Sequence, residues 1–324
     1  MKRVLVLLVV LLPLVLAHPA RSQPAGKTAL VGVLTPGEAV SYREEVLARS
    51  LREMGWVEGK NLRLEYRRAG NNVDRLRSMA DELARMKVDL IIAQSTTAVA
   101  AAMKATSTIP IVISSADPVG SGFVPSLSRP GGNVTGVSMM MPSLAGKRLE
   151  LLREFSPRLA RVAFLAFRPD PAHSIFIAEM EAAGKRLGIT VHPQIVDSVD
   201  GIPSAFTAMK SARVEAVIIQ PLFVNTFKRG PQIAELANAA RIMSVSDGDL
   251  FADEGGLMMY GPDPRVIYRR LATYVDRILR GAKPGDLPVE QPQSFQLVIN
   301  MKTATRLGLK LPQPVLARAD RLVE

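Results

Sequence analysis

The chain has 324 residues, a formal net charge of +11 and no cysteine. It can therefore form no disulfide framework and carries no thiol nucleophile or lipid-bearing cysteine, and three histidines exclude a histidine-rich metal site. The basic residues are dispersed and aromatic residues make up only 5% of the chain, so we predict a solvated basic surface and no nucleic-acid partner.

The N-terminal segment has the pattern of a secretory signal. It begins Met1-Lys2-Arg3, continues as an apolar run to Leu16 that only Pro13 interrupts, and then reaches small residues. The run is shorter than the roughly 20 apolar residues that a membrane-spanning helix needs. We predict a cleaved signal peptide over residues 1–25 and a periplasmic mature protein that is not a lipoprotein; an uncut N-terminal anchor is the alternative.

Short apolar strands alternate with helices through the first half of the remaining chain. The expected strands are residues 29–34, 61–66, 89–93, 109–114 and 134–138, and the expected helices are residues 42–54, 73–86 and 97–105. Short β-branched runs separated by helices of 10–15 residues are typical of a parallel sheet with right-handed crossovers. We therefore predict an α/β lobe.

The pattern then starts again. The second half is expected to contain helices at residues 145–155, 173–187, 202–211, 225–240, 264–279 and 303–307, and strands at residues 161–167, 189–194, 215–220, 242–246, 257–260 and 295–299. The stretch "KVDLIIAQ" at 87–94 matches "RVEAVIIQ" at 213–220, residue type by residue type. About 300 residues usually divide into two units, so we predict two lobes of one design.

The known short motifs of catalysis and cofactor binding are missing from the sequence. Gly26-Lys27-Thr28 lacks the earlier glycine of a phosphate loop and precedes the first expected strand. Gly-x-Gly-x-x-Gly, Gly-x-Ser-x-Gly and His-Glu-x-x-His do not occur in a suitable place. We predict no catalytic residue, no metal and no cofactor; an exported α/β enzyme that uses cleft carboxylates remains the alternative, because such pairs need no motif.

A ligand site is expected where the strands end. In open parallel α/β sheets, ligands bind outside the carboxyl ends of the strands, and two such sheets would face each other across a cleft. We therefore predict a small-molecule site formed by residues that follow the expected strands, namely Thr35, Pro36, Gln94, Ser95, Thr96, Ser115, Asp117, Phe167, Arg168, Gln220, Pro221, Asp247 and Tyr260.

The hydroxyl cluster Ser95-Thr96-Thr97 lies between a buried strand and a helix. The free N–H groups of a helix N-terminus favour a carboxylate or another anion. The alternative is that a hydroxyl only caps its own helix. Asp117 and Asp247 leave a similar choice open, because each could bind a ligand ammonium or hydroxyl group or could cap the turn in which it lies.

Long stretches of the chain resemble one protein family. They are "LREMGWVEGKNLRLEYRRAGNNVDRLRSMADELARMKVDLIIAQST" at 51–96, "TSTIPIVISSADPVGSGFVPSLSRPGGNVTGVS" at 106–138 and "LPVEQPQSFQLVINMKTATRLGLKLP" at 287–312. These stretches are similar to the ABC-transporter substrate-binding proteins related to the tryptophan-binding TrpX type. The region 168–262 is similar in its order of strands and helices more than in its residues.

The resemblance implies a type I periplasmic-binding-protein fold, with two Rossmann-like lobes joined by a three-segment hinge. Lobe 1 would comprise residues 26–137 plus 260–286, and lobe 2 residues 138–259 plus 287–324, with crossings near 137–142, 257–260 and 287–293. The implied function is capture of an amino acid or similar carboxylate-bearing metabolite by hinge closure. The expected partners are ABC permease subunits, and we expect a monomer.

The resemblance also suggests roles for the cleft residues. In amino-acid binders of this fold, a hydroxyl-rich loop takes the ligand carboxylate and an acid takes the ammonium group, for which Asp247 is the candidate. The loops "FRPDPAH" and "QPLFVNTF" are expected to set specificity. A ligand sensor that docks a membrane receptor in place of a permease is a further alternative.

Overall fold

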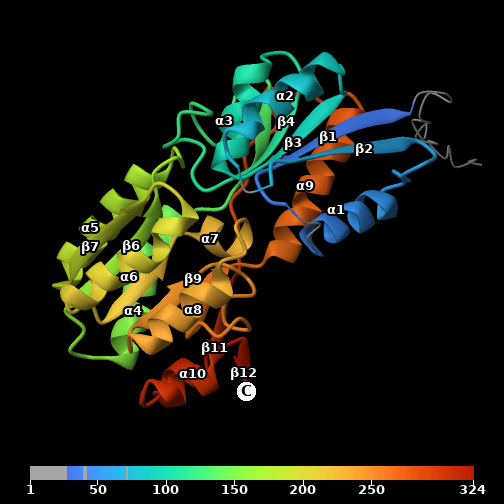
Figure 1. Cartoon of the computed structure of the whole chain (residues 1–324). Coiled ribbons are helices and arrows are strands. Elements are labelled where there is room, and N and C mark those ends of the chain that lie inside the picture. Colours follow the sequence, from blue (N-terminus) through green and yellow to red (C-terminus); the bar gives the residue numbers. More distant parts are fainter. Residues whose placement is uncertain (1–27, 39–41, 71) are drawn as a thin grey trace, which may run out of the picture.

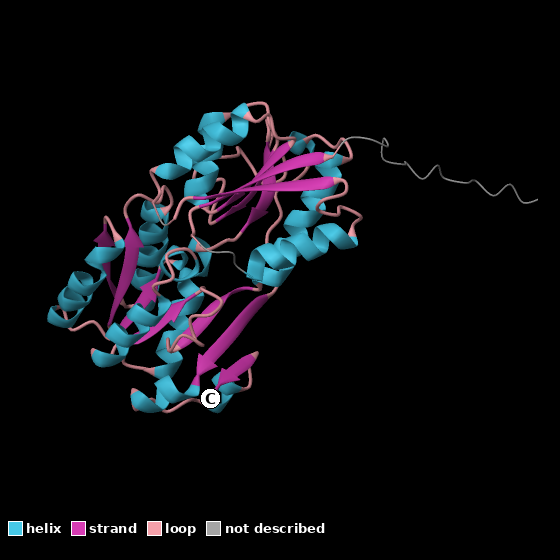
Figure 2. Ribbon diagram, turned by 45° about the vertical axis from the view of Figure 1, so that its right-hand side comes forward, coloured by secondary structure: helices cyan, strands magenta, loops and turns pink. Residues whose placement is uncertain are grey.

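The computed structural model of the chain describes residues 28–38, 42–70 and 72–324, so the predicted signal peptide at 1–25 lies outside the described residues. The described chain forms two α/β lobes (Figure 1). Figure 2, from a second direction, shows their sheets as separate units. Of the helices described, none has the length and apolar character needed to cross a membrane.

The first lobe is built on a sheet with the strand order β2-β1-β3-β4-β5, in which all described pairings are parallel. Its strands are β1 (Ala29–Thr35), β2 (Leu62–Arg68), β3 (Leu90–Gln94), β4 (Ile111–Ser115) and β5 (Val134–Ser138). Its apolar side chains form two clusters, one on each face. Helices α1 (Tyr42–Glu53) and α9 (Pro264–Leu279) cover one face, and α2 (Arg75–Arg85) and α3 (Thr96–Ala105) cover the other.

The second lobe repeats this design and extends it. Its sheet has the order β12-β11-β10-β9-β8-β6-β7, and the part β7-β6-β8-β9-β10 has the connectivity of β2-β1-β3-β4-β5. The strands are β6 (Arg161–Phe167), β7 (Thr190–Val196), β8 (Ala216–Ile219), β9 (Met243–Ser246), β10 (Met258–Pro262), β11 (Phe295–Asn300) and β12 (Arg321–Val323). Strand β11 is antiparallel to β10. With β12 it extends the second sheet by two strands that have no counterpart among the described residues of the first lobe.

Helices cover both faces of the second sheet as well. One apolar cluster joins the sheet to α4 (Ala145–Phe155), α5 (His173–Leu187), α10 (Met301–Arg306) and α11 (Gln313–Leu316). The other joins it to α6 (Ile202–Ser211), α7 (Pro221–Asn225) and α8 (Gly230–Ala239). The predicted fold, two lobes with largely parallel sheets covered by helices, is confirmed.

The predicted helix at 225–240 begins too early, because the helix in this range is α8, Gly230–Ala239. The chain forms the short helix α7, makes a turn and starts again as α8. Lys228 in that turn has a positive φ of 54°, which a continuous helix does not allow. Pro231 has no backbone N–H and suits the first turn of a helix, so it favours a new start there. Sequence reasoning also missed α11 and β12 near the C-terminus.

Three segments of the described chain cross between the lobes: residues 139–141 after β5, Asp263 after β10, and residues 291–294 before β11. Tyr260 lies within β10 of the second sheet, whereas Leu287 and Val289 pack in first-lobe clusters and Glu290 bridges to Val137 of β5. We propose that the second crossing is at Asp263, after the expected 257–260, and that the third is at 291–294, which overlaps the expected 287–293. We propose lobes of residues 28–138 plus 264–290 and of residues 142–262 plus 295–324.

Candidate ligand-binding site

A cavity of about 120 Å³ lies between the lobes, where the carboxyl ends of strands from both sheets meet. One ordered water needs roughly 10–15 Å³ of such space, so the cavity has room for a small organic molecule. It brings together part of the predicted site, namely Thr35, Gln94, Ser95, Thr96, Ser115, Gln220 and Pro221. The other predicted residues, Pro36, Asp117, Phe167, Arg168, Asp247 and Tyr260, do not line it.

Several of the residues outside the cavity have structural partners. Asp117 Oδ1 accepts a hydrogen bond of 2.9 Å from the Gly120 amide. Asp117 therefore caps the turn in which it lies, as one of its two predicted roles required. Arg168 pairs on the surface with Asp197, with 2.7 Å between Nε and Oδ1. Two others are aromatic: Phe167 packs edge-on against Phe223 and Phe227, and Tyr260 stacks on Phe295.

The junction between β3 and α3 forms one wall of the cavity. Ser95 has φ 104° and ψ 158°, a conformation that residues other than glycine rarely adopt and that is typically retained at functional sites. Its amide donates to the Ser114 carbonyl at 3.0 Å and its Oγ accepts from the Ala98 amide at 3.3 Å. The predicted helix cap is confirmed, and contact with a ligand stays a prediction.

Gln94, the last residue of β3, presents an unused donor to this wall. Its side chain is 8% exposed, and its Nε2 has no hydrogen-bond partner among the described residues. Leaving a buried amide N–H unpaired costs about 1–3 kcal/mol. An acceptor group on a bound molecule would recover that free energy, so Gln94 is suited to contact a carboxylate or carbonyl oxygen.

The opposite wall carries a buried carboxyl group, Asp170, in the predicted specificity loop at 167–173. Its Oδ2 accepts from Gln220 Nε2 at 2.8 Å and its Oδ1 from the Ala172 amide at 2.9 Å. Gln220 Oε1 in turn accepts from the Phe167 amide at 2.7 Å. Burial raises the pKa of Asp170 to about 6, although the Ala172 amide and His173 oppose the change.

Asp170 is absent from the predicted site, because for the loop after β6 the prediction named only Phe167 and Arg168. A carboxylate can accept about four hydrogen bonds, and two to Asp170 come from the protein. The remaining acceptor capacity is available to a donor in the cavity. The acid in this wall is therefore Asp170, where the sequence had suggested Asp247.

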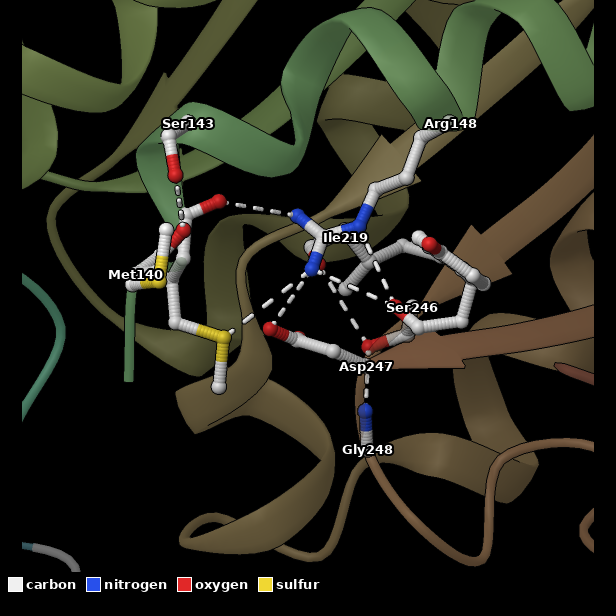
Figure 3. A network of polar contacts seen from close by, with 9 residues as sticks. Met140, Ser143, Arg148, Ile219, Ser246, Asp247 and Gly248 are labelled. Carbon is white, nitrogen blue, oxygen red and sulfur yellow. Dashed lines mark hydrogen bonds and ion pairs between the residues drawn. The ribbon is translucent and has the colours of Figure 1, made fainter. Parts of the chain in front are cut away.

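Asp247 lies behind the cavity, in a buried ion pair with Arg148 of α4 (Figure 3). Arg148 Nη2 is 2.8 Å from Asp247 Oδ2, and the side chains are 1% and 0% exposed. The same guanidinium donates to the backbone carbonyls of Met141 at 3.4 Å and Tyr260 at 3.3 Å. Asp247 Oδ2 is thus used inside the second lobe, and the residue does not line the cavity.

The rest of the lining is partly apolar and partly basic. Phe176, Leu222, Tyr268, Met139 and Met141 supply apolar surface. Arg43 and Lys228 supply positive charge, and Glu44 lies beside them in an ion pair with Arg68. Their positions in helices and turns gave no local sign of a cavity. Among the described residues, no group of three or more His, Asp or Glu side chains comes together to hold a metal ion.

Comparison with known proteins adds a family and several relatives. The family of ABC transporter substrate binding proteins matches residues 31–323. A tyrosine-binding protein of Clostridioides difficile (strain R20291) is 24% identical over 265 residues, which are 81% of this chain and 75% of that protein.

Two solved structures are similar over nearly the whole chain. A conserved domain protein of Vibrio cholerae has a TM-score of 0.84 and 27% identity, covering 91% of this chain and all of that one. An ABC domain from Streptococcus pneumonia in complex with L-Trp has a TM-score of 0.82 and 25% identity, covering 92% and 100%.

Proposed function

We propose that this chain, which belongs to the family of ABC transporter substrate binding proteins, captures a free amino acid with an apolar or aromatic side chain in its interlobe cavity. One observation carries the choice of ligand: a hydroxyl-capped helix N-terminus and an amide donor that has no partner among the described residues face a buried carboxyl group across one small cavity. Two related proteins bind tyrosine and L-Trp by their names, and both ligands are amino acids with aromatic side chains.

The proposed binding mode uses the two walls for opposite charges. The ligand carboxylate would accept from Gln94 Nε2 and from N–H groups at the start of α3, where the helix dipole favours an anion. The ligand ammonium would donate to Asp170. The ligand side chain would pack on Phe176, Leu222 and the methionines at 139 and 141, because these supply the apolar part of the lining.

We further propose that the protein acts outside the cytoplasm as a monomer, delivers its ligand unchanged to ABC permease subunits and closes on that ligand by a hinge. Family membership supports the receptor role and the location, since the family's members are binding proteins. The three crossing segments support a hinge, because they connect two separately packed apolar cores. The ligand-sensor alternative differs only in the membrane partner.

The experiment is a thermal-shift screen of the twenty L-amino acids, followed by calorimetric titration of those that stabilise the protein. A ligand at 100 times its Kd stabilises the folded state by about 2.7 kcal/mol, which is readily seen as a rise in Tm. Asp170→Asn is expected to weaken binding about tenfold or more, since a hydrogen bond to a charged group is worth roughly 1.5–3 kcal/mol.

Asp197→Asn is the matched control, because Asp197 is an exposed carboxylate of the same lobe and does not line the cavity. The control is expected to bind like the wild type. A screen in which no amino acid raises Tm, or an Asp170→Asn variant that binds as tightly as the control, would contradict the proposed ligand class.

A further inference from the structure

The two lobes make a direct charged contact beside the cavity. Asp249, in the turn after β9 of the second lobe, accepts hydrogen bonds from the Tyr42 hydroxyl and the Arg43 guanidinium. Both donors lie in the first turn of α1, which packs in the first lobe. The contact therefore joins the lobes across the cleft, at a distance of more than 200 residues along the chain.

Arg43 belongs to the contact and to the cavity at once. Its side chain lines the cavity next to Tyr268 of α9, whereas Asp249 does not line it. The two charged side chains are only 18% and 10% exposed. An ion pair so far withdrawn from water is screened less than a surface pair.

The surroundings keep both groups charged. Burial opposes ionisation of Asp249, but the Arg43 guanidinium charge and the hydrogen bonds from Tyr42 and Arg43 together outweigh it and lower the pKa of the carboxyl group. Burial likewise acts against the charge on Arg43, and the Asp249 carboxylate raises its pKa. The pair is therefore ionic at neutral pH, and separation of the lobes would break it.

We infer that the Arg43–Asp249 pair is an interlobe latch that stabilises the closed arrangement, and that Arg43 thereby helps to determine ligand affinity. A protein whose binding-competent form is only partly populated binds with an affinity reduced by that fraction. The latch raises the population of that form. The consequence for affinity rests on the proposed function, whereas the consequence for the lobe arrangement does not.

Asp249→Asn is the decisive variant, because it removes the charge of the latch without changing any residue that lines the cavity. Asp253→Asn is its matched control. Asp253 lies four residues further on and pairs with Arg321 at 2.6 Å. Asp253 and Arg321 both belong to the second lobe, so their ion pair does not join the lobes. Arg43→Lys keeps the positive charge and is expected to retain part of the effect.

The lobe arrangement is measured by pulsed electron paramagnetic resonance between two spin labels. The chain has no cysteine, so Ser107→Cys and Lys185→Cys, both exposed and one in each lobe, give a clean labelling pair. Distances are recorded without ligand and with an excess of L-tryptophan or L-tyrosine over the protein. We expect Asp249→Asn to shift population from the short to the long distance and to weaken amino-acid binding about two- to fivefold, with Asp253→Asn unchanged.

Identical distance distributions for Asp249→Asn and Asp253→Asn would overturn the latch, even if the wild type binds amino acids. The opposite pattern is also informative. If neither amino acid binds the wild type but Asp249→Asn still lengthens the interlobe distance, the latch stands and the proposed ligand class falls.

Discussion

Asp170 lies in the cavity wall and is almost completely buried. This burial moves the pKa of its carboxyl group toward the physiological range. The residue is 6% exposed and hydrogen-bonded to Gln220 and the Ala172 amide. Because burial raises its pKa to about 6 from an unfolded value near 3.9, the carboxylate form carries a cost in the ligand-free protein. A ligand ammonium group would offset that cost.

The pH dependence follows from this shift. A carboxyl group whose folded pKa is raised destabilises the folded state above the folded pKa, and this penalty disappears as the pH falls from about 6 to about 4. Relative to Asp170→Asn, the wild type should therefore gain free energy of unfolding over that window, on the order of 2–3 kcal/mol. Urea unfolding of both proteins between pH 4 and 8 measures the difference.

Ligand affinity should also depend on the ionisation of Asp170. Because the ammonium needs the ionised carboxylate, affinity should fall about tenfold per pH unit below pH 6, and calorimetry in two buffers should detect proton release. Parallel pH profiles for the wild type and Asp170→Asn would contradict this role.

At the scale of elements, the two lobes contain the same strand–helix unit, and the glutamine at the end of its strand has different partners in each lobe. Strands β3 and β8 come from the matching sequences at 87–94 and 213–220, and Lys87 and Arg213, which match, both have φ 54°. The two glutamines at the ends of these sequences both line the cavity. Gln94 Nε2 has no partner within the part of the chain that the structure describes, whereas Gln220 binds Asp170 and the Phe167 amide. We expect one to bind ligand directly and the other to orient Asp170.

Arg148 ties helix α4 to the first crossing segment at Met141 and to strand β10 at Tyr260, so removal of this side chain should be costly. Arg148→Met would leave the Asp247 carboxylate buried without its partner, which typically destabilises a protein by about 3–5 kcal/mol. Replacing both residues, as Arg148→Met with Asp247→Leu, should restore most of that stability, because an apolar pair has no desolvation penalty.

Urea unfolding of the wild type, both single variants and the double variant forms a double-mutant cycle for this pair. Arg321→Met is the control for loss of an arginine from a carboxylate pair that is partly exposed. An Arg148→Met variant no less stable than Arg321→Met would show that the buried pair is not holding α4 in place.

At the scale of the whole molecule, hinge closure should leave the interior of each lobe unchanged. Trp56, the single tryptophan of the chain, is 6% exposed in the first-lobe core, and its Nε1 donates to Asp276 Oδ1 of α9 at 2.9 Å. Both partners belong to one lobe. A rigid-body movement of the lobes would therefore not alter its surroundings.

We predict that a bound amino acid without an indole group lowers the radius of gyration in solution scattering but leaves the Trp56 emission maximum unchanged. Met139→Trp places a second tryptophan in the cavity lining and serves as the positive control, since its emission should respond. A shift of Trp56 emission in the wild type would indicate rearrangement inside the first lobe and not hinge closure alone.

The sequence by itself determined most of the strands and helices and the duplicated lobe design, and it predicted the edge of the sheets at which a ligand would bind. These features depend on local periodicity and on the rule that parallel strands end together, so short stretches of sequence carry them. It also identified the hydroxyl loop at 95–97, because a helix cap is a local contact. Asp170 remained hidden, since its burial against Gln220 depends on two loops that are 50 residues apart.

Only the tertiary structure decided what the acidic residues after β9 do. Asp247 and Asp249 stand two residues apart in similar local sequence. One is buried against Arg148, 99 residues away, and the other pairs across the cleft with Arg43, 206 residues away. A carboxylate's role follows from which cation and how much water surround it, and those are set by packing between distant elements, which no local pattern encodes.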